Sequence, residues 1–527
     1  MAIGITAVGI GRAERVIRPF RPYAQKPVGR HPSALLPRRK LAPVAAQSKS
    51  ASVRRYSSLP GVSLNPAQKL APLSPDRLGF NLHVASDVTR PGLIQLMRNA
   101  RAGIVRWPGG TQSDVYHWRT HTMCGGWNPH PNSTFDQFMG SFVQPGRFNV
   151  AVTLNYGTNE SCTGGGDPAE AAAWVAYAKA KGYRVKYWTV GNEVFGPWET
   201  DLHAQPHDPK TYAQEVAQGY YPQIKAVDPK AKVGIVVNPY DLWDATGWTR
   251  TVLQKTPYDF VETHYYPLLD EATRDSDLLF NGVPDFRAQI LALRQAMGSR
   301  KREIMLGEFN NVPTRPNRQT MSVVNALYTG MLLAESAELN VSAAFPWELQ
   351  EDYCSHDPAK GLLPTANFKS DLYGWQTFAT YSAFSIGFPS ASETCSKGLP
   401  TLPFGTPFPV ARTARLFGQF VNARGSMVAT EVSPEFPLIR AYGASRGSGF
   451  GLLLFNLDSA QSVTLPVNLM GESVQRTVQI WTYGKQQYDQ SRFNRWVGPA
   501  KQTLGTLSPT FQVELPPWSM SFVQVGL

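Results

Sequence analysis

The chain has 527 residues, of which 42% are hydrophobic and 17% are charged. It contains no unbroken apolar run long enough to span a bilayer, so these values exclude an integral membrane protein and predict a soluble globular one. The formal net charge of +12 suggests a nucleic-acid partner until the charges are located along the chain.

The positive charge is concentrated at the N-terminus. Residues 1–70 hold 13 lysines and arginines against one acid, Glu14, whereas the remaining residues hold 38 basic and 38 acidic side chains. This segment is also rich in Pro, Ala and Ser without helical or strand periodicity, so we predict that it is disordered. A nucleic-acid or anionic-surface role would rest wholly on residues 1–70, and we predict neither a nucleic-acid nor a membrane partner.

From Leu78 the chain alternates short apolar or aromatic runs with amphipathic segments, which is typical of a parallel sheet covered by helices. Eight such runs follow one another: "LGFNLHV", "GIVRWPGG", "NVAVTLNYGT", "VKYWTVGNE", "KVGIVVN", "FVETHYYP", "EIMLGEFN" and "VSAAFPWE". We therefore predict a (β/α)8 TIM barrel over residues 71–405, with the functional residues at the C-terminal ends of its strands. An open doubly wound sheet is the alternative, but no glycine-rich phosphate loop follows the first strand.

Helices are predicted between these strands. In "DPAEAAAWVAYAKAKG", Asp167 is a suitable N-cap, Pro168 fits the first helical position and Gly182 can end the helix. Comparable helical segments are 211–227, 286–298 and 323–340. After about residue 410 the pattern changes to strand-like runs without intervening helices, which predicts a C-terminal antiparallel β-sandwich as an accessory domain over residues 406–527.

The four cysteines have no spacing typical of a metal site. On the barrel interpretation, Cys124 and Cys162 lie in neighbouring loops, and Cys354 and Cys395 both follow the last strand. Each couple could form a disulfide, which would indicate an oxidising compartment and hence a secreted or periplasmic protein. Four free thiols are the alternative, and the N-terminal sequence "MAIGITAVGIG" lacks the basic residues of a typical signal peptide.

Two glutamates occupy ends of predicted strands. Glu193 ends the fourth strand and Glu308 ends the seventh, so their side chains can face each other across the mouth of the barrel. Glycoside hydrolysis needs such a pair, since one carboxyl group protonates the leaving oxygen while the other attacks or stabilises the anomeric carbon. The alternative for any one glutamate is a solvated surface charge.

Four segments resemble the clan A glycoside hydrolases, and most closely the family 51 α-L-arabinofuranosidases. In chain order they are "VRWPGGTQSDVYHW", "VTLNYGT", "VKYWTVGNEVFGPWE" and "ETHYYP". The similarity is densest between Gly103 and Asp228. The resemblance implies a retaining mechanism in which Glu193 is the acid/base and Glu308 is the nucleophile.

The same resemblance implies further site residues. Asn192 would bind the sugar 2-hydroxyl, His264 and Tyr266 would reach the active site, and Arg106 would lie beneath the nucleophile and lower its pKa. Asn155 and Trp347, which end strands three and eight, would contact the sugar. The alternatives are a buried ion pair for Arg106, a core histidine for His264 and barrel packing for Trp347. The tryptophans of the expected top-face loops could likewise stack on sugars or only pack: Trp107, Trp118, Trp127 and Trp198.

The sequence also departs from the family. Leu82 stands where family 51 members usually carry a sugar-binding glutamate on the first strand, and the nucleophile segment reads "GEFN" instead of "DEWN". We therefore expect a retaining glycoside hydrolase that acts on polysaccharide or oligosaccharide, with α-L-arabinofuranosidase the leading activity. The alternatives are a β-xylosidase, a β-glucuronidase, an endo-glycanase or an inactive carbohydrate-binding barrel. No metal and no organic cofactor is expected, because carboxyl groups suffice for this chemistry.

Overall fold

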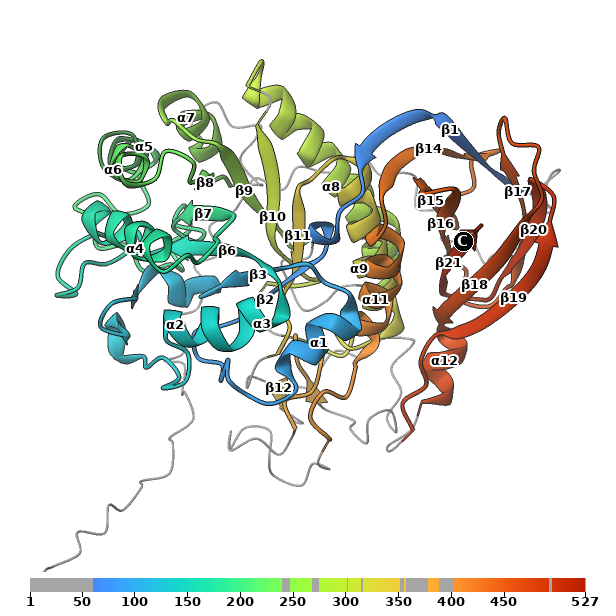
Figure 1. Ribbon diagram of the computed structural model, residues 1–527, viewed down its shortest axis with the longest axis horizontal. Coiled ribbons are helices and arrows are strands. Elements are labelled where there is room, and N and C mark those ends of the chain that lie inside the picture. The colour runs from blue at the N-terminus through green and yellow to red at the C-terminus, as the bar shows by residue number, and fades with distance from the viewer. Residues whose placement is uncertain are drawn as a thin grey trace, which may run out of the picture.

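The computed structural model describes residues 60–238, 247–267, 274–300, 302–313, 316–350, 355–356, 378–387, 402–491 and 495–526. A parallel barrel and a C-terminal sheet stand side by side, with helices α9 (Val323–Glu338) and α11 (Pro409–Val421) between them (Figure 1). Cys354 and Cys395 lie outside the described residues, so the structure does not test their predicted pairing.

The barrel contains the eight predicted strands in chain order, and every neighbouring pair is parallel. They are β2 (Gly79–Asn81), β3 (Ile104–Trp107), β6 (Asn149–Leu154), β7 (Tyr187–Val190), β8 (Val233–Val236), β9 (Phe260–Tyr265), β10 (Glu303–Phe309) and β11 (Ala343–Pro346). A parallel bridge between Leu78 and Ala344 joins the first strand region to the last. The prediction of a (β/α)8 barrel is confirmed.

Helices surround this barrel, as the amphipathic segments predict. They include α1 (Leu93–Ala100), α4 (Pro168–Ala180), α5 (Pro209–Glu215), α6 (Tyr221–Val227), α7 (Trp248–Lys255) and α8 (Asp275–Met297). The N-terminus of α4 forms as expected, because Asp167 accepts a hydrogen bond from the backbone of Ala169 and Pro168 begins the helix. The segment 211–227 is one helical run interrupted by a π-helical turn, Val216–Tyr220. Helix α8 begins at Asp275, well before the predicted start at residue 286.

The lower part of the barrel interior is filled with side chains. Seven buried residues from its strands form one closed cluster: Ile104, Ala151, Tyr187, Phe260, Met305, Ala343 and Phe345. The rings of Tyr187 and Phe260 meet edge to face, 4.9 Å between centroids. The barrel is therefore a packed core, and its polar chemistry is confined to the C-terminal ends of the strands.

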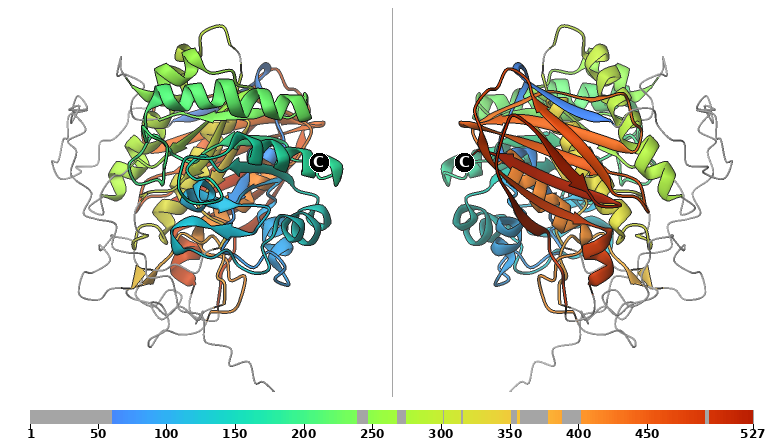
Figure 2. Two further views of the ribbon diagram at one scale, coloured as in Figure 1. Left: turned by 90° about the vertical axis from the view of Figure 1, so that its left-hand side faces the viewer. Right: turned by 90° about the vertical axis from the view of Figure 1, so that its right-hand side faces the viewer.

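The C-terminal region is a nine-stranded mixed sheet in the order β19-β18-β21-β16-β15-β14-β1-β17-β20. Its strands are β1 (Gly61–Pro72), β14 (Gly425–Ser433), β15 (Ile439–Arg446), β16 (Gly449–Asn456), β17 (Val463–Leu469), β18 (Arg476–Gly484), β19 (Ala500–Leu507), β20 (Thr510–Leu515) and β21 (Ser519–Val525). One apolar cluster takes residues from both halves of this sheet, so the halves fold over a shared core as in a sandwich (Figure 2). Neither β19 nor β20 was among the strand-like runs expected from the sequence.

Strand β1 corrects the prediction for the N-terminal segment. The sequence analysis assigns residues 1–70 to a disordered segment, but Gly61–Pro72 is a strand that pairs antiparallel with β14 and parallel with β17. Its buried side chains Val62 and Leu64 belong to the core of the C-terminal sheet. The chain therefore contributes one strand to this sheet before it enters the barrel, as the blue ribbon in Figure 1 shows.

The barrel and the C-terminal sheet share a hydrophobic core. Phe455 of β16 and Met520 of β21 lie in the same cluster as the buried face of α9. Gly330 of α9 allows this contact, since a Cβ there would lie 2.7 Å from the sulfur of Met520. No helix among the described residues has the length and apolar character needed to cross a membrane.

Candidate active site

The predicted site residues converge at the C-terminal ends of the barrel strands. Arg106 lies in β3, His264 in β9 and Glu308 in β10. Asn192 and Glu193 follow β7 after Gly191, whose φ of 79° turns the chain at the strand end. Glu193 itself has a φ of 44°, a left-handed conformation that is uncommon for a side chain with a Cβ and that is found where the surrounding structure enforces it.

Arg106 is the fully buried centre of a hydrogen-bond network. Its guanidinium donates to Glu308 Oε1 at 2.9 Å and to Asn192 Oδ1 at 2.6 Å, and its Nε lies 2.7 Å from Glu262 Oε1. It also donates to Asn81 Oδ1 at 2.9 Å. Arg106 therefore pairs with two acids: the predicted nucleophile, as the resemblance implies, and a second buried carboxylate, Glu262. A buried charge with these partners is held in one position.

Glu193 and Glu308 face each other with His264 beside both. His264 Nδ1 lies 2.7 Å from Glu193 Oε1 and 3.6 Å from Glu308 Oε2. One oxygen of each glutamate and this nitrogen all lie within 4.8 Å of one another. Tyr266 donates to Glu308 Oε2 at 2.9 Å, and Trp198 donates to Glu193 Oε2 at 2.7 Å. The two carboxyl groups thus lie within a few ångströms although strands β7 and β10 are far apart in sequence.

The surroundings move the pKa values of the two glutamates in opposite directions. Burial favours the neutral form of Glu193, but hydrogen bonds from His264 and Trp198 outweigh it and lower the pKa. Burial and the nearby charge of Glu193 raise the pKa of Glu308 despite His264 and Arg106. Arg106 lowers the pKa of Glu308, as expected, but burial and the charge of Glu193 outweigh this contribution, so the net shift is upward. Although burial opposes it, the three surrounding glutamates raise the pKa of His264 to about 10.

Glu262 is a site residue that the sequence analysis missed. It lies two residues before His264 on β9, so both side chains point to the interior of the barrel, and His264 Nε2 lies 3.1 Å from its Oε1. Gly307 on the neighbouring strand leaves the necessary space, since a Cβ there would lie 2.1 Å from Glu262 Oε1. The sequence pattern that could have identified Glu262 is an acid two positions before His264 in a largely apolar strand, because residues two apart in a strand point to the same side.

Two further acids that were not predicted from the sequence, Glu199 and Asp114, hold Asn192 in place. The Asn192 amide donates to Glu199 Oε1 at 3.0 Å, and its backbone N–H donates to Asp114 Oδ2 at 3.0 Å. Thr111 also donates to Glu199 Oε1 at 3.0 Å. Burial and the nearby acids Asp114 and Glu193 raise the pKa of Glu199 well above its usual range, which favours the neutral carboxylic acid. No periodicity or spacing singles out Glu199 from sequence.

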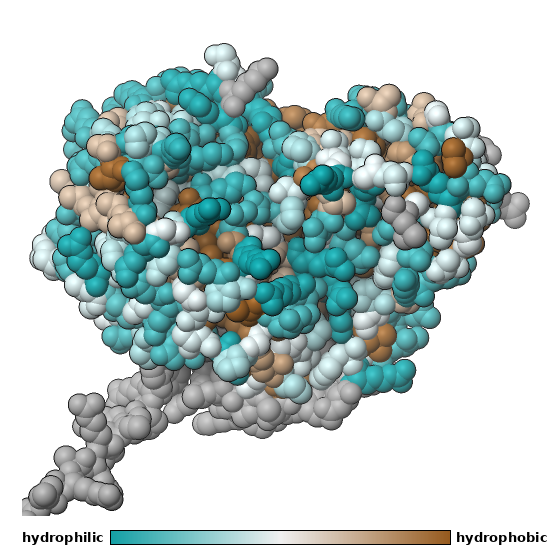
Figure 3. Space-filling model, in the orientation of Figure 1, coloured by the Kyte–Doolittle hydropathy of each residue, from teal (hydrophilic) through white to brown (hydrophobic). Residues whose placement is uncertain are grey.

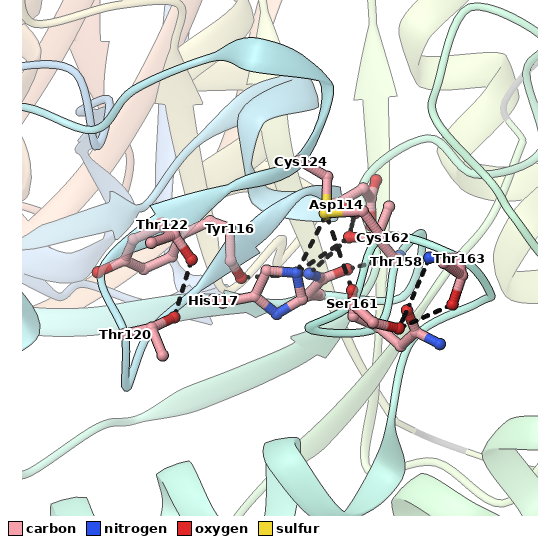
Figure 4. Close-up of a disulfide and its surroundings, with 12 residues drawn as sticks. Asp114, Tyr116, His117, Thr120, Thr122, Cys124, Thr158, Ser161, Cys162 and Thr163 are labelled. Carbon is pink, nitrogen blue, oxygen red and sulfur yellow. Dashed lines mark hydrogen bonds between the residues drawn. A yellow bond between two sulfur atoms is a disulfide. The ribbon is translucent and has the colours of Figure 1, made fainter.

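Asn155 contacts its own loop and the loop that follows β3, and it has no hydrogen bond to either glutamate. Its amide donates to the Tyr116 carbonyl at 3.2 Å and to Thr158 Oγ1 at 3.1 Å, and its Oδ1 accepts from the Thr158 backbone. A disulfide between Cys124 and Cys162 ties this loop to the loop after β3, with the imidazole of His117 between them (Figure 4). The predicted pairing of Cys124 with Cys162 is confirmed. It braces two of the loops that follow barrel strands.

The predicted aromatic contacts are only partly placed to meet a ligand. Trp347 follows β11 and is half-buried, with its ring 4.7 Å from that of His83 and against Gly110. Trp107 and Trp118 are buried in an aromatic cluster around Trp174, which favours packing for both. Trp198 is 44% exposed and lies beside Glu193, so of these tryptophans it is the one attached directly to the glutamate pair.

A metal ion fits this site poorly. Glu193, His264 and Glu308 offer three atoms at a spacing that a metal could bridge. Because the pKa of His264 is raised to about 10, its imidazole is protonated at neutral pH and offers no lone pair. Arg106 and Tyr266 also occupy the two oxygens of Glu308.

Comparisons with known proteins agree with this architecture. No protein-family model matches the chain. An exo-α-(1→6)-L-arabinofuranosidase from Bifidobacterium longum is 27% identical over 231 residues, which cover 37% of this chain and 42% of that protein. The α-L-arabinofuranosidase C of Emericella nidulans is 23% identical over 40% of this chain and 48% of its own length. The chain thus matches less than half the length of these curated relatives.

Solved structures cover more of the molecule. The α-L-arabinofuranosidase of Thermotoga maritima superposes with a TM-score of 0.64 at 18% identity, over 89% of this chain and 100% of that one. A family 44 xyloglucanase from Paenibacillus polymyxa gives 0.59 at 11% identity, over 89% of this chain and all of that one. The chain resembles the family 51 arabinofuranosidases in sequence and in fold. The resemblance inferred from its motifs is thereby confirmed, and these structural likenesses concern the fold alone.

Proposed function

We propose that this protein is a retaining glycoside hydrolase in which Glu308 is the nucleophile and Glu193 is the acid/base. The observation that carries the proposal is the approach of the two carboxyl groups, with an oxygen of each within 4.8 Å of the other. Retaining glycosidases hold these groups about 5–5.5 Å apart, whereas inverting enzymes need about 6.5–9.5 Å to admit a water molecule.

The roles follow from the donors that face each carboxylate. Arg106 donates to one oxygen of Glu308 and Tyr266 to the other, so both oxygens are used as acceptors and the ionised form is favoured for attack. Glu193 instead faces a protonated imidazole at 2.7 Å, which is a source of the proton that a leaving group needs. These contacts favour the assignment that the resemblance implies, although burial raises the pKa of Glu308 in the free protein.

In the proposed first step a sugar enters between the two glutamates. Its arrival desolvates Glu193 further and raises its pKa, so the proton moves from His264 Nδ1 to Glu193 Oε1 and then to the glycosidic oxygen. Glu308 attacks the anomeric carbon as the bond to that oxygen breaks, which gives a glycosyl ester and a free alcohol. Asn192, fixed between Arg106 and Glu199, is placed to hold the 2-hydroxyl.

In the second step water replaces the leaving group. Glu193 takes a proton from the water as its oxygen attacks the anomeric carbon, and the ester bond to Glu308 breaks with release of the sugar. The proton returns to His264, which restores the starting charges. The anomeric configuration is retained because each step inverts it once.

The proposed substrate is a polysaccharide or oligosaccharide with α-L-arabinofuranosyl groups, because the relatives are named as α-L-arabinofuranosidases. One observation favours a different sugar. Leu82 is fully buried where the family carries a sugar-binding glutamate, so that contact is missing here. Cleavage of β-xylosides, β-glucuronides or internal polysaccharide bonds with the same pair of glutamates is therefore the second candidate. The Cys124–Cys162 disulfide supports an oxidising compartment, and we propose that the protein is secreted or periplasmic.

The proposal is tested by hydrolysis of a panel of 4-nitrophenyl furanosides and pyranosides, together with an arabinose-containing polysaccharide. The parent should cleave at least one of them. Glu193→Gln should lose about 10²–10⁴-fold on the polysaccharide and less on the activated aryl glycoside, which needs little acid assistance. Glu160→Gln, which removes an exposed glutamate outside the site, is the matched control. An inactive parent that still binds the sugars would indicate a binding protein, and equal losses on both substrates would exclude Glu193 as the acid.

A further inference from the structure

The structure contains a polar cavity at the end of the barrel opposite to the glutamate pair. It has a volume of about 370 Å³ and opens where residues that precede β2, β3 and β6 meet α1, α3 (Gln144–Gly146) and α11. Figure 1 shows α1 between α3 and α11, and Figure 3 shows hydrophilic residues with some apolar ones among them over this part of the surface. Its volume is in the range of small-molecule sites.

Four arginines line this cavity, and no acidic residue does: Arg98, Arg101, Arg147 and Arg415. None of them forms an ion pair with an acid in the described part of the chain. The three helices contain no Asp or Glu, and the sequence has none from residue 88 to residue 113 or from 394 to 430. All four arginines are exposed, and the acid nearest in sequence to the lining, Asp76 after Pro75, pairs with Lys186. No ion pair within the described residues therefore neutralises the positive charge around the cavity.

Two of these arginines occupy backbone positions that favour other residues. Arg101 ends α1 and Arg147 ends α3, and both have a φ of 60°, the left-handed conformation in which Gly and Asn are preferred. A helix C-terminus attracts a cation, which explains part of the choice. It does not explain why both side chains line the same cavity as Arg98 and Arg415.

A fifth arginine, Arg446, lies close enough to Arg101 for their positive charges to repel each other. Burial and the charge of Arg101 lower the pKa of Arg446, which lies on β15, to about 10. Arg101 is held close to α11, since a Cβ on Gly418 would lie 2.9 Å from the Cβ of Arg101. Like charges gathered without an acid are stabilised when an anion binds among them.

We propose that this cavity binds an oxyanionic ligand of about monosaccharide or disaccharide size. Guanidinium groups pair with carboxylate and phosphate oxygens in the same bidentate way, so a sugar acid and a phosphorylated sugar share the required chemistry. The cavity is larger than one inorganic phosphate fills, so it has room for a sugar ring beside the anionic group. The site is separate from the glutamate pair, so it does not depend on the proposed glycosidase activity.

Calorimetric titration of the full-length protein with galacturonic acid, glucose 6-phosphate and inorganic phosphate tests the proposal, with galactose as the uncharged control. At least one of the anionic sugars should bind more tightly than galactose, and added NaCl should weaken it. Tighter binding of galacturonic acid would indicate a carboxylate ligand, and tighter binding of glucose 6-phosphate would indicate a phosphate ligand. No binding of either anionic sugar at about 10 mM, or equal binding of galactose, would overturn the proposal.

The double variant Arg101→Asn with Arg147→Asn locates the site. Asn suits the left-handed conformation at both positions, so the variant should fold and show an unchanged Tm. Binding of the anionic sugar should weaken by at least about tenfold, as expected when two charge-assisted contacts are lost. Arg250→Gln, an exposed arginine on α7, removes a charge elsewhere and should have no effect. Parent-like affinity in the double variant would show that the anion binds somewhere else.

Discussion

Three carboxylates and two cations share the mouth of the barrel, and the position of one proton among them decides the chemistry. Glu193, Glu262 and Glu308 surround His264, whose raised pKa of about 10 keeps it protonated at neutral pH. Arg106 supplies the second positive charge. With two cations for three acids the group carries one net negative charge, and in the proposed mechanism the transfer of a proton from His264 to Glu193 leaves this net charge unchanged while it places the proton on the proposed acid.

Glu199 is predicted to act as a neutral acid. It accepts hydrogen bonds from Asn192 and Thr111, and its raised pKa favours the protonated form. Glu199→Gln preserves an acceptor of the same shape, so kcat/KM should stay within about threefold of the parent. Glu199→Ala leaves the Asn192 amide without this partner and should lower kcat/KM about tenfold, the value of one hydrogen bond of about 1.4 kcal/mol. A loss in the Gln variant as large as that in the Ala variant would show that an ionised Glu199 is required.

Sequence reasoning located those site residues that stand at strand ends, because the barrel brings strand ends together. Glu193 and Glu308 were predicted in this way, whereas Arg106 and Tyr266 were predicted only from the family resemblance. The pKa of Glu308 could not be foreseen, since it depends on burial and on distances that only the folded chain sets. Glu199 was missed for a related reason: its importance comes from lying beside Asn192 and Thr111.

Strand β1, near the N-terminus, pairs with two strands of the C-terminal region. It lies between β14 and β17 in the C-terminal sheet, and Leu64 on it is completely buried. Leu64→Ala should lower the free energy of unfolding by about 2–5 kcal/mol, the cost of a cavity in a packed core. Gln68→Ala on the exposed part of the same strand is the control and should change it by less than about 0.5 kcal/mol. Urea unfolding measures both, and equal small effects would mean that β1 contributes little to the sheet.

The elements with strong local patterns were predictable, and those that depend on distant partners were not. The eight barrel strands and the capped start of α4 follow from apolar runs and from Asp167 and Pro168. Strand β1 was assigned to a disordered segment because its surroundings are basic and proline-rich, and its parallel pairing with β17 bridges some 400 residues. Strand β19 was missed because it is largely exposed and carries few apolar residues, and β20 because it is short and its apolar side chains alternate with exposed polar ones.

At the scale of the whole molecule, the barrel and the C-terminal sheet form one packed body. The α9 helix contacts both, and Tyr442 of β15 donates to Glu335 of that helix at 2.8 Å. The shared core fixes the outer side of the barrel while the disulfide between Cys124 and Cys162 fixes two loops at its mouth. The glutamate pair is therefore held by a rigid frame, which a two-step mechanism at about 5 Å requires.

The central claim is that Glu308 forms a covalent bond to the sugar while Glu193 moves the proton. The most direct measurement is mass spectrometry of peptides from the protein after incubation with a 2-deoxy-2-fluoro aryl glycoside of the preferred sugar, which slows release of the intermediate. The predicted result is one sugar attached to the peptide that contains Glu308, and none in Glu308→Gln. A sugar attached to another residue, or turnover with inversion and no attached sugar, would contradict it.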